Sequence, residues 1–222
     1  MSLAERKERE KEQRHKDIVD AAQRLFFANK YDDVSMDDIA REVELSKATL
    51  YLYFKNKESL YFAVLLLGLY ILRDRFAEAA GDNQRGLDKI SALCRAFFKY
   101  CQDYPEYYQL MCDARSRRFD MNQVESAEEQ IAVAEEIIGN ICHSVSEGVT
   151  DGTLRKELKP IETAVFIMDT CEGIVRPALE SAWYLESRKV TLEQYFAHSM
   201  GLLIYSISGA NTVQKAGAGG IR

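Results

Sequence analysis

Residues 35–57, SMDDIAREVELSKATLYLYFKNK, contain two short amphipathic segments joined by three residues. Apolar residues recur at helical spacing from Met36 to Val43, and Ser35 precedes them where an N-cap residue belongs. Ser46 occupies the same position before the second segment. Two helices of about eight residues with such a short connection predict a helix-turn-helix, whose second helix can enter a DNA major groove.

The second helix is predicted to have one apolar edge and one polar face. Leu50 and Phe54 are four residues apart and form the apolar edge, which anchors the helix. The outward pairs supply an ammonium, hydroxyls and phenols, which can bond phosphates and reach base edges. These pairs are Lys47 with Tyr51 and Thr49 with Tyr53. Residues 45–57 contain three lysines and no acid, which favours a DNA surface over a plain three-helix bundle with two surface tyrosines.

The whole chain has the composition of a helical globular protein. It has 222 residues and a net charge of −6, with only 3 prolines and 12 glycines, so a collagen-like or turn-rich all-β chain is excluded. The longest uncharged apolar run, residues 59–72, is shorter than a membrane span, and the charged N-terminus is unlike a secretory signal. We expect a cytoplasmic protein whose five cysteines pack in the core, without metal or cofactor.

Residues 18–60 closely resemble the N-terminal domain of the TetR family of transcriptional regulators. The resemblance rests on the Leu25-Phe26 end of the first helix, the Ile39-Ala40 pair, and residues 45–54, LSKATLYLYF, followed by Lys55, Lys57 and Leu60. It implies an all-α fold in which an N-terminal three-helix DNA-binding domain precedes a larger ligand-binding and dimerisation domain, about nine helices in total. The expected boundaries are 1–57, 58–210 and a disordered tail at 211–222.

The resemblance also assigns roles to eight residues of the DNA-binding domain. Backbone phosphates would be held by Ser35, Tyr51 and Lys57. Ser46 would cap the recognition helix, and the major groove would receive Lys47, Ala48, Thr49 and Tyr53. Two positions depart from the family pattern, because Glu44 and Ala48 stand where glycine is common. Glu44 implies either a turn without a positive φ or some backbone strain.

The remainder of the chain is predicted to be helical up to about Gly209. An eighth helix is expected from Pro160 to about Leu185, bent near Pro177, and a ninth after Thr191. Both have wide apolar faces, which fit ordinary core or pairing with a second copy. The resemblance implies a homodimer through these two helices, and two-fold symmetry then implies a palindromic operator.

An aromatic cluster in the C-terminal part fits either core or an effector cavity. Its candidate cavity residues are Tyr61, Leu65, Phe97, Phe98, Tyr104, Tyr107, Met111 and Trp183. Such residues more often fill core, since cavities are few per protein.

Three classes of function remain to be compared. The first is a ligand-responsive DNA-binding regulator, most plausibly a repressor released by a small-molecule effector. An enzyme is disfavoured, because the three histidines are scattered and no nucleophile, phosphate-loop or zinc-protease motif is present. A helical adaptor that binds a partner protein is the third, and the acid-free recognition helix argues against it.

Overall fold

The computed structural model describes residues 2–81, 85–117 and 119–209, and these are almost entirely helical. The described helices, with two short 3-10 turns, are α1 (Leu3–Ala28), η1 (Tyr31–Asp33), α2 (Met36–Glu42), α3 (Lys47–Tyr51), α4 (Lys57–Ala79), α5 (Gly86–Asp103), α6 (Pro105–Ser116), η2 (Met121–Gln123), α7 (Ala127–Thr150), α8 (Pro160–Glu180), α9 (Ala182–Glu186) and α10 (Leu192–Ile207). Within these residues the only β pairing is an isolated antiparallel bridge between Leu154 and Ser208. The all-α prediction is confirmed.

One helix boundary differs from the sequence prediction. The expected bent helix from Pro160 to Leu185 is two helices, because α8 ends at Glu180 and α9 begins at Ala182. Pro177 lies inside α8, which continues past it to Glu180, and the backbone leaves helical geometry only at Ser181, with φ −124° and ψ 38°. The break explains why the described residues form ten helices where about nine were expected.

The chain forms two compact units, and each is described by itself. The first contains residues up to 70 together with residues 104–132, and the second contains residues 71–103 together with the described residues from 133 onward. The predicted functional boundary at residue 57 is a different division and stays a prediction. The predicted tail, 211–222, lies outside the described residues.

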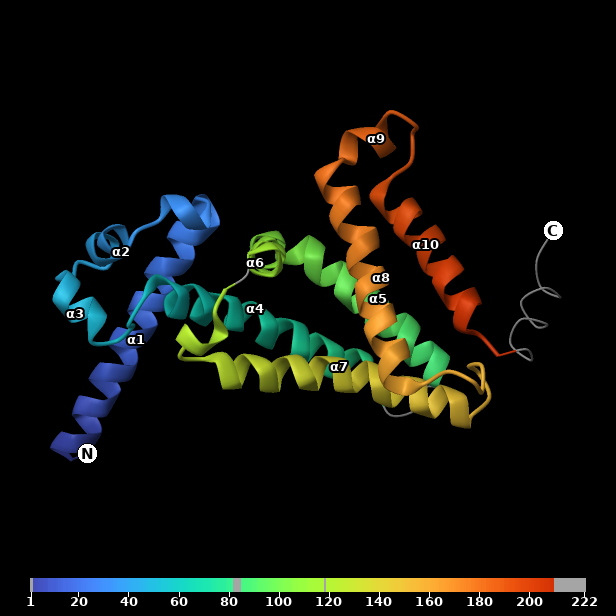
Figure 1. The fold of residues 1–222 in the computed structure, drawn as a ribbon, viewed down its shortest axis with the longest axis horizontal. Helices are drawn as coiled ribbons and strands as arrows, with labels where there is room; N and C mark the ends of the chain where they lie inside the picture. The colour runs from blue at the N-terminus through green and yellow to red at the C-terminus, as the bar shows by residue number, and fades with distance from the viewer. Residues whose placement is uncertain (1, 82–84, 118, 210–222) are drawn as a thin grey trace. The chain divides into compact units, whose positions relative to one another are not determined.

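In the first unit, α2 packs on α1 and α3 packs on α2 (Figure 1). The first half of α1 is exposed, and its burial begins at Ile18, which is fully buried together with Ala22. An aromatic cluster fills the space beside this helix: the Tyr61 ring lies 5.1 Å from that of Phe26 and 5.0 Å from that of Tyr31, both edge to face. These contacts hold the helix-turn-helix on a rigid base.

In the second unit, α8 packs along α10, and both contact α5 (Figure 1). Phe98 of α5 stacks on Phe196 of α10 with ring centroids 4.0 Å apart. Of the five cysteines, four are buried and Cys142 is half-buried, so the prediction of core packing is confirmed for the four.

The start of α5 crosses the end of α7 at unusually close range. A Cβ placed on Gly86 would lie 2.1 Å from the backbone nitrogen of Gly148 and 2.5 Å from the carbonyl oxygen of Ser144. Only glycine allows this approach of two backbones. The Asp151 carboxylate strengthens the crossing by accepting a hydrogen bond of 2.9 Å from the Gly86 N–H.

Candidate nucleic-acid interface

Helix α2 is fixed at its start by a reciprocal cap. The Ser35 hydroxyl accepts a 3.2 Å hydrogen bond from the Asp38 N–H, and the Asp38 carboxylate accepts one of 3.0 Å from the Ser35 N–H. The Ser35 hydroxyl also donates to the Asp38 carboxylate, at 2.5 Å. This bond, followed by the one from the Ser35 N–H, lowers the pKa of Asp38, so the cap carries a negative charge at the positive end of the helix. Ser35 itself is exposed.

The turn between α2 and α3 contains a strained residue. Glu44 adopts φ 55°, the left-handed region that disfavours side chains with a Cβ. The following residue closes the turn, because the Leu45 N–H donates to the Ala40 carbonyl at 2.8 Å. The sequence left two alternatives for Glu44, a turn without a positive φ or some backbone strain. The structure shows the second, backbone strain.

Helix α3 begins at a second serine cap. The Ser46 hydroxyl accepts a 3.1 Å hydrogen bond from the Thr49 N–H and lies 2.8 Å from the Thr49 hydroxyl. Lys47 follows at the first helical position, exposed, with its ammonium 2.8 Å from the Asp37 carboxylate of α2. The hydrogen bond to Asp37 raises the pKa of Lys47, so this side chain is charged at neutral pH.

The recognition helix has the two faces that the spacing predicted. Leu50 is fully buried and Phe54 nearly so, whereas Lys47 and Ala48 are exposed and Tyr51 is 44% exposed. Thr49 and Tyr53 are half-buried at the edge of the outward face.

One residue of this face was missed by the sequence reasoning. Leu52 is 83% exposed although it is apolar. It stands four residues after Ala48, so both lie on the same side of the helical turn. The sequence could have predicted this exposure, because a residue two positions after the buried Leu50 lies on the opposite side of a helix.

Lys57 differs from the role implied by the family resemblance. Its ammonium donates 2.9 Å hydrogen bonds to the carbonyls of Tyr31 and Val34 and lies 4.0 Å from the centre of the Tyr31 ring. The side chain is half-buried and points into the first unit. Lys57 therefore acts as a clamp on η1: its ammonium is hydrogen-bonded to carbonyls of this chain and is not free to contact a phosphate.

A second pair, also absent from the sequence prediction, holds η1 from the other side. The Arg117 guanidinium donates two hydrogen bonds of 2.8 Å to the Asp32 carboxylate, a bidentate pair across 85 positions of sequence. The same guanidinium lies 5.0 Å from the centre of the Tyr31 ring. Its hydrogen bond to Asp32 lowers the pKa of that carboxyl. The connection between α1 and α2 is therefore tied to α4 by Lys57 and to the end of α6 by Arg117.

The residues predicted to line an effector cavity divide between the two units. Those in the first unit are Tyr61, Leu65, Tyr104, Tyr107 and Met111, and those in the second are Phe97, Phe98 and Trp183. Several are ordinary core: Tyr61 is fully buried with its hydroxyl donating to the Leu110 carbonyl at 2.9 Å, and Phe98 stacks on Phe196.

Trp183 corrects the prediction most clearly. It lies on the short helix α9 with 68% of its surface exposed, and its ring contacts that of the neighbouring Tyr184 at 5.8 Å. The single tryptophan is a surface residue because the break at Ser181 carries it off the end of α8.

The described residues form neither a membrane-spanning helix nor a metal-binding cluster. None of their helices is long and apolar enough to cross a membrane. No group of three or more His, Cys, Asp or Glu side chains in the described ranges has the arrangement needed to hold a metal ion.

The comparisons with known proteins agree with this geometry. The model of the bacterial regulatory proteins of the tetR family matches residues 18–64. The chain is 32% identical over 91 residues to the biofilm operon icaADBC HTH-type negative transcriptional regulator IcaR of Staphylococcus epidermidis, a match that covers 41% of this chain and 47% of that protein. The chain thus spans about half the length of this relative.

Solved structures share the fold over most of the chain. The transcriptional regulator FadR of Bacillus subtilis, solved in complex with stearoyl-CoA, has a TM-score of 0.65 at 19% identity, covering 86% of this chain and 98% of that one. The ketosteroid transcriptional regulator KstR2 of Mycobacterium tuberculosis has a TM-score of 0.62 at 19% identity, covering 88% and 95%.

At such low identity these structures show the fold alone, whereas the matched motif lies in the capped helix pair described above. Residues 18–64, which contain this helix pair, match the TetR family of bacterial regulatory proteins.

Proposed function

We propose that the protein is a DNA-binding transcriptional regulator that binds a palindromic operator as a homodimer and is released by a small-molecule effector. The observation that carries the proposal is the division of α3 into a buried edge and an exposed face. Leu50 and Phe54 anchor the helix, while Lys47, Ala48 and Tyr51 stand in solvent on a segment without acids. Surface helices commonly have an exposed face, but this one carries an ammonium and a phenol and no carboxylate, which suits a polyanion.

The exposed face suggests how the helix would read DNA. Lys47 and Tyr51 supply an ammonium and a phenol for phosphates or base edges, and Ser35 offers a hydroxyl and backbone at the start of α2. Thr49 and Tyr53 would lie beside the bases. Ala48 and Leu52 form an apolar pair of the kind that contacts thymine methyl groups in the major groove. Lys57 would contribute by positioning η1.

The proposed dimer interface is the apolar surface of α8 and α10. Side chains that normally avoid solvent are exposed along both helices: Ile161, Val165, Phe166, Leu179, Leu202 and Tyr205. Exposed apolar surface of this extent marks an interaction site more often than a free surface. Paired with its own copy, this face would form a four-helix bundle and set two α3 helices one or more DNA turns apart.

The effector and the sign of regulation are further parts of the proposal. Helix α4 begins at Lys57 and continues to Ala79, so it contributes residues to both compact units. An effector that favours one arrangement of α4 would change DNA affinity, with a reciprocal effect on effector affinity. Repression is favoured because the curated relative is a negative regulator. We place the protein in the cytoplasm, where operator DNA lies, and assign it no enzymatic activity.

The test is selection of duplexes from a random library, followed by binding measurements at several salt concentrations. A palindromic consensus is expected, with affinity that falls steeply as salt rises. Thr49→Ala should change the preference among operators, whereas Tyr51→Phe, which removes a proposed phosphate contact, should weaken all duplexes alike. A consensus without two-fold symmetry, or binding insensitive to salt, would overturn the proposal.

The adaptor alternative makes the opposite prediction. A partner protein bound through α3 would be displaced by duplex DNA only if the two share that face. If DNA shows no binding while a partner is retained by the wild-type chain and lost in the Tyr51→Ala variant, the adaptor reading replaces the regulator.

A further inference from the structure

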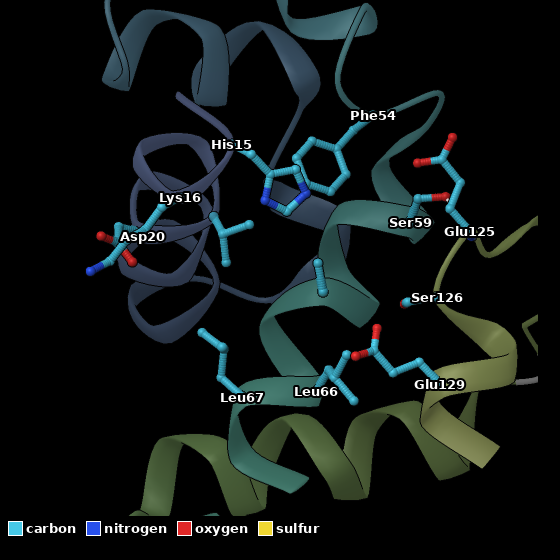
Figure 2. Close-up of a pocket in the computed structure, with 12 residues that line it drawn as sticks. His15, Lys16, Asp20, Phe54, Ser59, Leu66, Leu67, Glu125, Ser126 and Glu129 are labelled. Atoms are coloured by element: carbon cyan, nitrogen blue, oxygen red, sulfur yellow. The ribbon is translucent and has the colours of Figure 1, made fainter. Parts of the chain in front are cut away.

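A cleft in the first unit lies directly beneath the recognition helix. It has a volume of about 520 Å³, within the range of small-molecule sites, and is lined by α1, α4, the start of α7 and Phe54 (Figure 2). Phe54 is the buried anchor of α3, so this wall of the cleft is the back of the proposed reading element. None of the eight residues predicted to bind an effector lines it.

The floor of the cleft is apolar. Val19 of α1 and Ala63, Leu66 and Leu67 of α4 provide aliphatic surface, and the Phe54 ring closes one end. The His15 ring packs against Phe54 with centroids 4.8 Å apart, as Figure 2 shows. An apolar chain or ring of a ligand would therefore be buried here.

The rim of the cleft is predominantly acidic. Asp20, Glu125 and Glu129 line it, against one lysine, Lys16. Glu125 is 3.3 Å from the ammonium of Lys55, a residue outside the lining. Neither Asp20 nor Glu129 forms a salt bridge with another residue of the described ranges. The lining thus favours a cation over an anion.

Two polar groups make Glu129 the best candidate to hold that cation. Its carboxylate accepts a hydrogen bond from the Tyr70 hydroxyl, which orients it, and Figure 2 shows it turned toward the interior while Lys16 and Asp20 lie on the opposite side. Next to it, the hydroxyl of Ser126 is buried without a hydrogen-bond partner among the described residues. Leaving such a group unpaired is unfavourable, and a ligand N–H would satisfy it.

We propose that this cleft binds a small amphiphilic amine, with its ammonium between Glu129 and Ser126 and its apolar part on Leu66, Leu67 and Val19. The occupant would touch Phe54, the side chain on which α3 rests. The cleft shares no residue with the effector cavity predicted from the sequence, and its test needs no DNA, so either proposal can fail without the other.

The experiment compares three probes of equal chain length: octylamine, octanol and octanoate. Binding to the full-length protein is measured by isothermal titration calorimetry near neutral pH, where the amine is a cation and the acid an anion. We expect octylamine to bind about tenfold more tightly than octanol, and octanoate more weakly still. Equal binding of all three, tighter binding of octanoate, or no binding of octylamine would overturn the proposal.

Two variants locate the site. Glu129→Gln should reduce octylamine affinity about tenfold and leave octanol affinity unchanged. The matched control is Glu128→Gln, an exposed neighbour outside the lining, which should change neither. Ala63→Trp, which fills the cleft, should abolish binding of every probe; thermal unfolding verifies that it folds. Equal effects of the Glu129 and Glu128 variants would place the amine elsewhere and overturn the assignment.

Discussion

Replacement of Lys57 by methionine separates a structural clamp from a phosphate contact. The change keeps most of the aliphatic stem and removes the ammonium that donates to the Tyr31 and Val34 carbonyls at 2.9 Å each. A hydrogen bond to a charged group contributes about 1.5–3 kcal/mol. Because Lys57 is half-buried, water replaces part of this loss, and we expect the first unit to be destabilised by about 2–3 kcal/mol.

The assay is urea unfolding followed by circular dichroism, with Lys55→Met as the matched control. Lys55 is also a lysine of the acid-free segment, but its side chain is 79% exposed and pairs with Glu125 at 3.3 Å. Exposed pairs of this kind contribute about 0–1 kcal/mol. The control should therefore unfold within about 0.5 kcal/mol of the wild type.

DNA binding gives the second readout. Each lost phosphate contact lowers the slope of log affinity against log salt by about 0.9. Lys57→Met, measured where it is fully folded, should keep the wild-type slope because its ammonium is occupied by carbonyls. A Lys57 variant as stable as the Lys55 control, with a slope reduced by about 0.9, would refute the clamp and restore the phosphate role.

Three other changes test separate features. Glu44→Gly should raise the free energy of unfolding by about 0.5–1 kcal/mol, because glycine relieves the left-handed strain at some entropic cost. Glu44→Ala should bring no gain. A glycine variant less stable than the alanine variant would contradict the strain. Phe166→Asp should convert a dimer to a monomer, as measured by light scattering. Ile131→Asp, at an equally exposed apolar position on α7, should leave the dimer intact. A dimer that survives Phe166→Asp would exclude the face of α8 and α10 as the dimer interface. Although burial opposes the shift, hydrogen bonds from Thr153 and Gly86 lower the pKa of Asp151, so its contribution to stability is present above the unfolded pKa of about 3.9 and is lost as the pH falls below it. Asp151→Asn should therefore destabilise at pH 7 and matter less near pH 3, as urea midpoints will show.

The features that the sequence predicted well are local. The caps at Ser35 and Ser46 and the buried edge at Leu50 and Phe54 follow from spacings of three and four residues, which the backbone converts directly into contacts. The same holds for most helix boundaries, since capping and proline signals act within one turn.

The features that the sequence did not predict depend on distant partners. Lys57 meets carbonyls 23 and 26 positions away, and Arg117 meets Asp32 across 85. Helical periodicity does not reveal contacts between residues so far apart in the sequence. Lys57 was therefore assigned to a phosphate, whereas in the structure its ammonium bonds to carbonyls of the same chain. Trp183 was assigned to a cavity by its residue type, although the end of α8 just before it decides its exposure.

The crossing of Gly86 over Gly148 has a mechanical consequence. No side chain lies between the two backbones, so a change of side-chain rotamer cannot let one helix slide along the other. The hydrogen bond from the Gly86 N–H to Asp151 fixes the same contact. Helices α5 and α7 therefore share a fixed fulcrum. Within the second unit, movement of α5 against α7 is therefore restricted to rotation about this crossing.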